Sequence, residues 1–250
     1  MEKSAKLGKL TLLNIILFGF IGQVAWAVEN NFFNTFLFSF GGTTKDISTM
    51  VAASAVVAVV TTFVMGTLSD KLGRRKVFIC AGYVAWGITV MAFAFISREN
   101  LGKLIGADPS SAAALSATVT TVIVMDCIMT FMGSTSNDSA FNAWITDVTV
   151  PSNRAKTEGL LAILPVLALV IVTGVFGFIA GDDAQASDYA TCFLGLGILV
   201  IICGIVGIFT IKDTGSGQKS DGNFFADLIY GFRPSVIKSH KCLYLSLACM

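Results

Sequence analysis

The chain has 250 residues, of which 54% are hydrophobic and only 13% are charged, and its mean hydropathy is +0.77. Soluble domains carry roughly 25% charged residues, so this composition excludes an ordinary soluble domain and indicates an integral membrane protein. The net charge of +1 identifies no partner by itself. We expect a lipid bilayer and a small-molecule substrate as partners, and no nucleic acid. The six cysteines lie in or beside apolar segments without metal-ligand spacing, so we expect no metal site and no cofactor.

The apolar residues are gathered into long blocks. Five charge-free runs of about 19–23 residues approach the ~20 residues that a helix needs to cross a ~30 Å hydrocarbon core. A sixth run, between Asp108 and Asp147, is interrupted only by Asp126 and Asp138. The ten-residue alternation typical of a β-barrel is not visible. We therefore predict an all-α membrane protein with six transmembrane helices in residues 1–211, at about 10–38, 46–68, 76–97, 113–144, 156–180 and 188–211.

Basic residues are distributed unevenly between the predicted loops. With the N-terminus on the inner side, 14 of the 17 Lys and Arg residues fall inside, and only Lys45, Arg98 and Lys103 fall outside. The positive-inside rule therefore predicts a multi-pass protein of the plasma (cell inner) membrane with a cytoplasmic N-terminus. The first apolar run is too long for a signal peptide and lacks an A-x-A-like cleavage site, so we interpret it as the first membrane helix.

Polar side chains gather on one face of the first helix. At 100° per residue, Gln23, Asn30 and Asn34 fall within about 40° of one another, and Trp26 lies about 60° to one side. Amides bond hydroxyl groups in both directions and an aromatic ring suits the apolar face of a sugar, so these four residues are candidates for substrate binding. The alternative is that the amides bond neighbouring helices. Glu29 lies roughly 120° from Gln23, away from the centre of this face, and could pair with a base or carry a proton.

The densest charge cluster lies between the second and third helices, in the stretch GTLSDKLGRRKVF at 66–78. Its acid, Asp70, ends one helix, and its bases, which include Arg74 and Arg75, begin the next. The helix macrodipole disfavours an anion at a C-terminus and cations at an N-terminus, so all of these charges stand at unfavourable helix ends. Positive-inside topology alone requires only the bases. Asp70 therefore indicates a tertiary role, either capping another helix or pairing with a base, while Gly73 permits a left-handed turn. The alternative is a solvated cytoplasmic loop.

The fourth helix carries polar residues at helical spacing. Ser134, Asp138 and Asn142 recur at i, i+4 and i+8 and so share one face. An acid in such a site can bind and release protons, which makes Asp138 a candidate coupling residue and Asn142 a candidate substrate ligand. The alternative ends the helix near Met132 and leaves a wet loop of about 24 residues, which is long for a compact protein. Asp126, about 18 Å from Asp138 along the axis, is the weaker candidate for such an acid, and the alternative for it is a tertiary hydrogen bond or an outward extension.

The composition of the chain changes after residue 211. The stretch KDTGSGQKSDG predicts a flexible cytoplasmic linker, and the apolar face of 223–232 predicts an interfacial helix within the linker at 212–235. The next apolar run, in 236–250, is too short to span a membrane. We therefore expect a fragment that stops at the truncated start of a seventh span, with the missing C-terminal half of the same protein as its partner.

The stretch GTLSDKLGRRK at 66–76 resembles the G-x-L-(A/S)-D-(R/K)-x-G-R-(R/K)-(R/K) loop of the major facilitator superfamily, and it stands between spans two and three as in that family. The resemblance implies the N-terminal half of a twelve-helix secondary transporter. It also implies that Asp70, Gly73, Arg74 and Arg75 belong to a charge latch against the second half, with Asp70 and Arg74 as its members.

The stretch NDSAFNAWITDVTVPSNRAKTEG at 137–159 is similar to the helix 4 to helix 5 region of the glycoside–pentoside–hexuronide:cation symporters, the melibiose-permease type. The positions that match the pattern are Asp138, Phe141, Asp147, Thr149 and Arg154. This resemblance implies uptake of a sugar or glycoside together with a cation. The helix 2 acids of that branch are missing here, and Ala58 and Thr62 stand near their positions. We therefore expect coupling to H⁺ rather than Na⁺, through Asp138 and Glu29.

Three classes of function remain open at this stage. The first is a cation-coupled transporter that works by alternating access, for a sugar or for a non-sugar solute. The second is an integral-membrane enzyme, which the single His240 and the lack of a nucleophile–base pairing do not support, so we expect no enzyme. The third is a non-transporting membrane scaffold or sensor, which the polar residues inside the spans disfavour.

Overall fold

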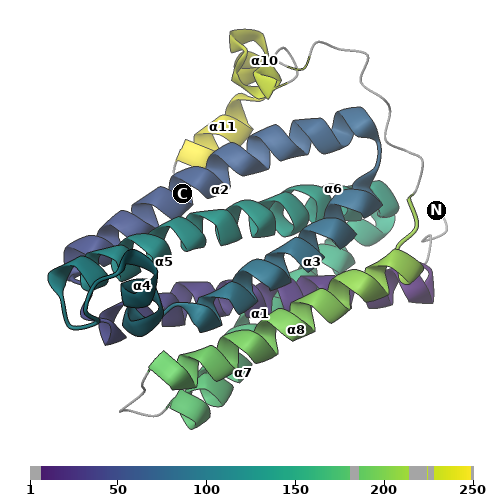
Figure 1. The fold of residues 1–250 in the computed structure, drawn as a ribbon. Helices are drawn as coiled ribbons and strands as arrows, with labels where there is room; N and C mark the ends of the chain where they lie inside the picture. Colours follow the sequence, from purple (N-terminus) through teal and green to yellow (C-terminus); the bar gives the residue numbers. More distant parts are fainter. Residues whose placement is uncertain (1–6, 181–185, 214–223, 225–227, 249–250) are drawn as a thin grey trace.

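The computed structural model describes residues 7–180, 186–213, 224 and 228–248, and these residues form a bundle of long helices without strands (Figure 1). Within this part of the chain, six helices are long and apolar enough to cross a membrane. They are built from α1 (Lys9–Ser39), α2 (Thr44–Leu72), α3 (Arg75–Ala92) with the turn η1 (Phe93–Phe95), α5 (Ala112–Gly133) with η2 (Ser134–Phe141) and α6 (Asn142–Val148), α7 (Pro151–Ala180), and α8 (Ala186–Thr210). A short helix, α4 (Arg98–Ile105), lies between the third and fourth spans. The predicted all-α fold with six membrane spans is confirmed.

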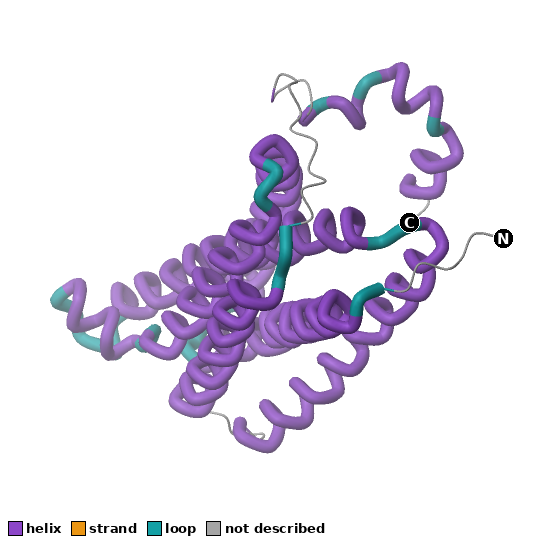
Figure 2. The backbone as a smooth tube through the Cα atoms, turned by 90° about the vertical axis from the view of Figure 1, so that its right-hand side faces the viewer, coloured by secondary structure: helices purple, strands orange, loops and turns teal. Residues whose placement is uncertain are grey.

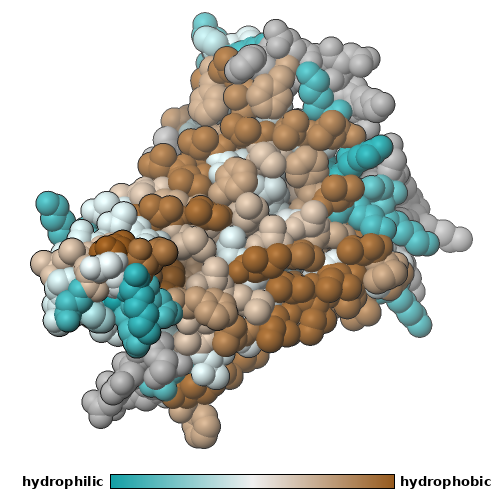
Figure 3. All heavy atoms as spheres, viewed as in Figure 1, coloured by the Kyte–Doolittle hydropathy of each residue, from teal (hydrophilic) through white to brown (hydrophobic). Residues whose placement is uncertain are grey.

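The surface of the bundle is apolar around its middle. Figure 3 shows hydrophobic residues over the central part of the visible face and hydrophilic residues at its two ends. Large apolar side chains such as Val59, Val170 and Ile202 are more than half exposed. A soluble protein rarely exposes so much contiguous apolar surface, whereas hydrocarbon solvates it well. The distribution is therefore that of a bundle whose middle faces lipid.

Local sequence signals set the two ends of α2. The Thr43 hydroxyl accepts a hydrogen bond from the Asp46 backbone N–H at 3.3 Å, and Asp46 Oδ2 accepts one from the Thr43 N–H at 2.8 Å. At the other end, Gly73 has a φ of 61°, and its N–H donates to the Ser69 carbonyl at 3.0 Å. Glycine adopts this left-handed conformation without steric cost, so Gly73 ends α2 and allows α3 to begin at Arg75.

Helices α3 and α8 pack closely because glycines meet at their interface. A Cβ at Gly197 would lie 2.6 Å from the Gly87 carbonyl oxygen, and a Cβ at Gly204 would lie 2.9 Å from the Cys80 carbonyl oxygen. Such distances are shorter than real Cβ contacts, so the two backbones can approach this far only with glycine at these positions. The interface fixes the position of α3, which carries Arg75 of the ion-pair site and Trp86, whose ring packs on Trp26.

The fourth span is helical throughout but changes its winding in the middle. Helix α5 continues directly into the π-helix η2, and η2 continues into α6. The prediction of a helix through Asp138 is thus confirmed, and the alternative of a wet loop after Met132 is not observed. Hydrogen bonds in a π-helix run from i to i+5, so a turn holds more residues than an α-helical turn. Residues after Ser134 therefore lie at angles that a regular α-helix does not predict.

The described residues from 228 onward lie on the outside of the bundle of six spans. Most of the predicted linker, 214–223 and 225–227, falls outside the described residues. The described part contains η3 (Tyr230–Phe232), α10 (Pro234–Ser239) and α11 (Lys241–Ala248). Figures 1 and 2 show these elements outside the bundle beside α2, where the Phe232 ring centroid lies 5.7 Å from that of Phe63. The interfacial helix over 223–232 and the start of a seventh span stay predictions.

Candidate functional site

A cavity of about 400 Å³ opens between α1, α2 and the fourth span. Its lining residues are Gln23, Trp26, Glu29 and Asn30 from α1, Val51, Ser54, Ala55 and Ala58 from α2, Thr130 from α5, and Asp138 from η2. Gln23 and Ala58 lie near the middle of α1 and α2, so the cavity lies close to the midplane of the bundle. The structure therefore brings five of the predicted substrate-binding and coupling residues to one place.

Two carboxylates line the cavity. Asp138 Oδ2 accepts a hydrogen bond from the Ser134 hydroxyl at 3.0 Å, and Glu29 Oε1 accepts one from the Thr130 hydroxyl at 3.1 Å. The other oxygen of Glu29 is buried and has no hydrogen-bond partner among the described residues. No basic side chain is among the described residues that line the cavity. The two carboxyl groups therefore have no basic partner among these lining residues, which favours binding of a proton or of a cationic group.

The cavity covers a wide sector of α1. Gln23, Trp26 and Glu29 extend over about 120° of the helix surface, and all three line the cavity. The helical wheel placed Glu29 away from the centre of the amide face. The structure includes Glu29 because the space between three helices is wider than the face of one helix.

Trp26 is held in place by its neighbours. Its ring centroid lies 5.0 Å from that of Trp86 on α3, with an angle of 49° between the ring planes. A Cβ at Gly133 would lie 2.9 Å from the Trp26 ring and 2.8 Å from the Trp86 ring, so this glycine leaves the space that both rings occupy. The Trp26 indole nitrogen is buried and lies near the Asp138 carboxyl group, without a hydrogen bond of good geometry. Buried indole N–H groups normally have a partner, so this donor can serve Asp138 or a ligand.

Two predicted substrate ligands lie outside the cavity. Asn34 follows Asn30 by one turn of α1 and is not among the lining residues. Asn142 is exposed, and its Nδ2 donates to the Asp138 carbonyl at 3.0 Å instead of lining the cavity. Of the three residues expected to share a face, Ser134 and Asp138 contact each other within η2, and Asn142 follows η2 and lies outside the cavity.

Asp126 is a third acid close to the cavity, and sequence reasoning left its role open. Its exposed fraction is 1%, and one of its carboxylate oxygens has no hydrogen-bond partner in the part of the chain described. The side chain reaches Ser54, a lining residue, and interacts electrostatically with Glu29. Asp126 therefore makes an inward tertiary contact and does not extend outward, and a role in coupling stays a prediction. The sequence signal for this residue was an isolated acid within an apolar run. An ionisable side chain inside a membrane span is costly in free energy, so it usually has a function.

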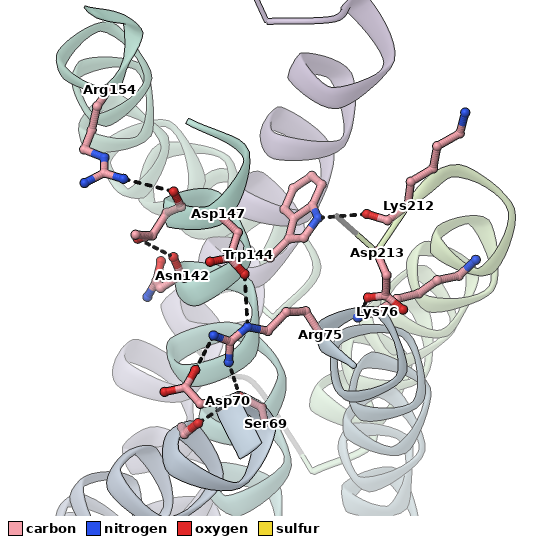
Figure 4. A network of polar contacts seen from close by, with 12 residues as sticks. Ser69, Asp70, Arg75, Lys76, Asn142, Trp144, Asp147, Arg154, Lys212 and Asp213 are labelled. Carbon is pink, nitrogen blue, oxygen red and sulfur yellow. Dashed lines mark hydrogen bonds and ion pairs between the residues drawn. The ribbon is translucent and has the colours of Figure 1, made fainter. Parts of the chain in front are cut away.

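A second polar site lies where α2 meets α3 (Figure 4). Arg75 is buried and forms ion pairs with Asp70 and with Asp147, the latter at 3.3 Å between Nε and Oδ2. Its Nη1 also donates to the Ser69 hydroxyl at 2.6 Å. One guanidinium thus connects α2, α3 and α6. The neighbouring Arg74 is exposed and forms no ion pair with the described residues.

The placement of these charges explains their order in the sequence. Asp70 pairs with a base, which is one of the two tertiary roles expected for it, and the structure identifies that base as Arg75 rather than Arg74. The other role, capping a helix N-terminus, is filled by Asp213, whose Oδ1 accepts a hydrogen bond from the Lys76 backbone N–H at 2.8 Å. A carboxylate in this place offsets the unfavourable bases at the start of α3.

The segment after α8 and the start of α7 are also held at this end. The Trp144 indole donates to the Lys212 carbonyl at 3.3 Å, which joins α6 to the residues that follow α8. Arg154 Nε donates to the Thr149 hydroxyl at 3.2 Å, and its Nη2 donates to the Thr146 carbonyl at 2.9 Å. Polar contacts thus connect four of the six spans at one end of the bundle.

Six apolar helices long enough to cross a bilayer define a multi-pass membrane protein. The family model of the Major Facilitator Superfamily matches residues 15–248. The chain therefore belongs to the major facilitator superfamily, a family of membrane transporters, and its six-helix bundle corresponds to one half of that fold. No curated protein and no solved structure matches the chain.

Proposed function

We propose that this protein is a secondary active transporter that moves a sugar or glycoside across the plasma membrane by alternating access coupled to H⁺. The proposed orientation has a cytoplasmic N-terminus, in agreement with the distribution of basic residues. The observation that carries the proposal is that Gln23, Trp26 and Asn30 line the same cavity as Glu29 and Asp138. A site near the midplane, between helices of one repeat and its counterpart, is where secondary transporters bind their substrates.

The chemistry of the cavity suits a hydroxylated solute. Trp26 offers an apolar ring surface together with an indole N–H that lies near the Asp138 carboxyl group. Gln23 offers an amide that can both donate to and accept from a hydroxyl group. Sugars present both an apolar ring face and hydroxyl groups, so they match this combination. The similarity of 137–159 to the melibiose-permease type of symporter supports the same class of solute.

The acids of the cavity support coupling to a proton. Ala58 lines the cavity near a position where the melibiose-permease type carries a helix 2 acid. A metal cation needs a shell of several oxygen ligands, whereas a proton needs a single carboxylate. Asp138 and Glu29 are therefore proposed as the groups that bind and release the coupled proton.

The ion pairs around Arg75 are proposed as a conformational latch. They join α2, α3 and α6 at one end of the bundle, and any movement that separates α2 from α6 must break one of them. Such pairs favour one of two arrangements of a transporter and thereby set the populations of its access states.

Uptake measurements test the proposal. Cells that express the complete gene product are supplied with a panel of labelled glycosides, and H⁺ and Na⁺ gradients are imposed separately. We expect accumulation that follows the inward H⁺ gradient and persists without Na⁺. A steep Na⁺ dependence at fixed pH would contradict proton coupling, and failure to accumulate any glycoside would contradict the solute class.

A cationic solute is a second candidate, because no basic residue is found among the described residues that line the cavity. Glu29 and Asp138 could bind an ammonium group directly, with Trp26 contributing a cation–π contact. The same assay with labelled organic cations separates the two candidates. Accumulation of cations without accumulation of glycosides favours the second.

A further inference from the structure

A separate cavity of about 500 Å³ lies on the outside of the bundle, along α3 and near the end of α8. Its lining residues are Lys76, Val77, Cys80, Ala81, Val84, Ala85 and Ile88 from α3, and Ile208 from α8. It shares no residue with the candidate substrate cavity. Apart from Lys76, every lining residue is apolar, so the cavity is an apolar groove with one charged end.

Small side chains form the floor of this groove. Ala81 and Ala85 lie four residues apart and therefore on the same face of α3. Val77 and Ile88 are 53% and 56% exposed, and they project from α3 toward either end of the groove. Between Lys76 and Ile88 the helix rises about 18 Å, which is comparable with the ~15 Å depth of one leaflet of the hydrocarbon core. The groove thus has the direction and length of a lipid acyl chain.

Basic residues gather at the Lys76 end of the groove. Arg74 and Lys212 are exposed, and Figure 4 shows the side chains of Lys76 and Lys212 extending to the same side. None of these three bases forms an ion pair with the residues that the structure describes. Asp213 lies beside them, and its Oδ1 accepts the hydrogen bond from the Lys76 backbone N–H. Asp70 and Asp147 pair with Arg75 at the same end. Three bases thus face one acid outside these ion pairs, and the local charge is positive.

We propose that this groove binds one anionic phospholipid, with an acyl chain along Ala81 and Ala85 and the headgroup phosphate on the Lys76 ammonium. Charge complementarity selects the headgroup, because basic pockets between membrane helices attract anionic lipids. The apolar groove selects a ligand with a chain, because buried hydrocarbon adds affinity in proportion to its area. The site does not depend on the proposed transport function, since none of its residues lines the substrate cavity.

The test is native mass spectrometry of the purified protein titrated with phosphatidylglycerol or with phosphatidylcholine of the same chain length. We expect one phosphatidylglycerol molecule to be retained at concentrations where phosphatidylcholine is not. Lys76→Gln should weaken phosphatidylglycerol binding about fivefold, the change that corresponds to the ~1 kcal/mol contributed by one base. Ala85→Phe should weaken binding of both lipids, because the added ring fills the groove. The matched controls are Lys45→Gln and Ala162→Phe, both at exposed positions away from the groove, and they should bind like the wild type.

Thermal unfolding in lipid-free detergent verifies that each variant is folded, and Ala81→Leu replaces Ala85→Phe if the latter is not. Equal retention of the two lipids would overturn the proposal. So would phosphatidylglycerol binding that is unchanged in both Lys76→Gln and the groove-filling variant. Displacement of the lipid by inorganic phosphate would show that the bases alone hold the ligand and would overturn the role of the groove.

Discussion

The Nε of Arg75 lies 3.3 Å from Oδ2 of Asp147, although 72 positions separate the two residues in the chain. The contact joins the beginning of α3 to α6 at the end of the fourth span. Arg75 also pairs with Asp70, so one buried guanidinium satisfies acids from two other helices. A charge that is buried with its partners becomes costly as soon as a partner is removed. This relationship therefore supports both the packing of the bundle and its proposed latch.

Arg75→Gln should destabilise the protein by about 2–3 kcal/mol, because the Asp147 side chain, only 19% exposed, would keep its charge without a base. Thermal unfolding in detergent measures the change. Arg74→Gln is the matched control, since Arg74 is exposed and forms no ion pair with the described residues. Equal losses in the two variants would mean that the pairing of Arg75 does not stabilise the fold.

Asp70→Asn should have a smaller effect on stability than Arg75→Gln, because the Asp70 side chain is 55% exposed. In the complete protein it should nevertheless slow transport while solute binding is retained, since one access state loses an ion pair. Transport rate, binding and cysteine accessibility from each side measure these effects. If all three are unchanged, Asp70 has no latch function.

Gly133→Ala should weaken solute binding roughly tenfold. The added Cβ would meet the rings of Trp26 and Trp86, so these two rings must shift together, and a displaced Trp26 loses solute contacts worth about 1–1.5 kcal/mol. Gly174→Ala is the matched control, because a Cβ there has no heavy atom within 4 Å. Solute affinity is measured for both variants. An affinity that is unaffected by Gly133→Ala would contradict the role of Trp26 as a solute ligand.

Gly197→Ala should destabilise the packing of α3 against α8 by about 1–3 kcal/mol, the usual cost of overpacking. Its Cβ would come within 2.6 Å of the Gly87 carbonyl oxygen, and a backbone atom cannot shift away at a small cost in free energy. Gly195→Ala, two residues away on the same helix, meets nothing within 4 Å and should be neutral or slightly stabilising. Unfolding temperatures of the two variants provide the comparison. A neutral Gly197→Ala would contradict the close approach of the two helices.

Glu29→Gln should abolish the response of uptake to a pH gradient while solute still binds. The substitution keeps the shape of the side chain and its hydrogen bond with Thr130 but removes the ionisable group. Glu158→Gln, at an exposed position of α7, serves as the control. Proton-driven accumulation at the wild-type level in Glu29→Gln would remove Glu29 from the coupling mechanism.

The six spans were predictable because bilayer thickness sets the length of a charge-free helix. The partner of Asp70 was not. Adjacent residues of a helix point about 100° apart, so the choice between Arg74 and Arg75 depends on where α3 begins. Gly73 signals the turn, but the rotation of α3 relative to α6 follows from tertiary packing with α8, which the local sequence does not report.

Some of the residues at the substrate cavity were predictable from the sequence, and others were not. Gln23, Trp26 and Asn30 belong to one uninterrupted α-helix, so the helical wheel places them together. Asn142 lies beyond the π-helix η2, and no residue pattern in η2 predicts that the helix changes its winding there. Asp126 meets Ser54 of another helix, and contacts between helices are not visible in the spacing of either one.

The most direct test of the proposed function is uptake of a labelled glycoside by cells that express the complete gene product with Asp138→Asn, beside wild type and the exposed-site control Asp108→Asn. Asp138 lines the substrate cavity with its Oδ2 bonded to Ser134, so loss of its ionisable group should remove coupling without removing the fold. We expect accumulation in the wild type and in the control, and solute levels no higher than equilibration in Asp138→Asn at equal membrane expression. Accumulation at the wild-type level in Asp138→Asn would contradict proton-coupled transport through Asp138.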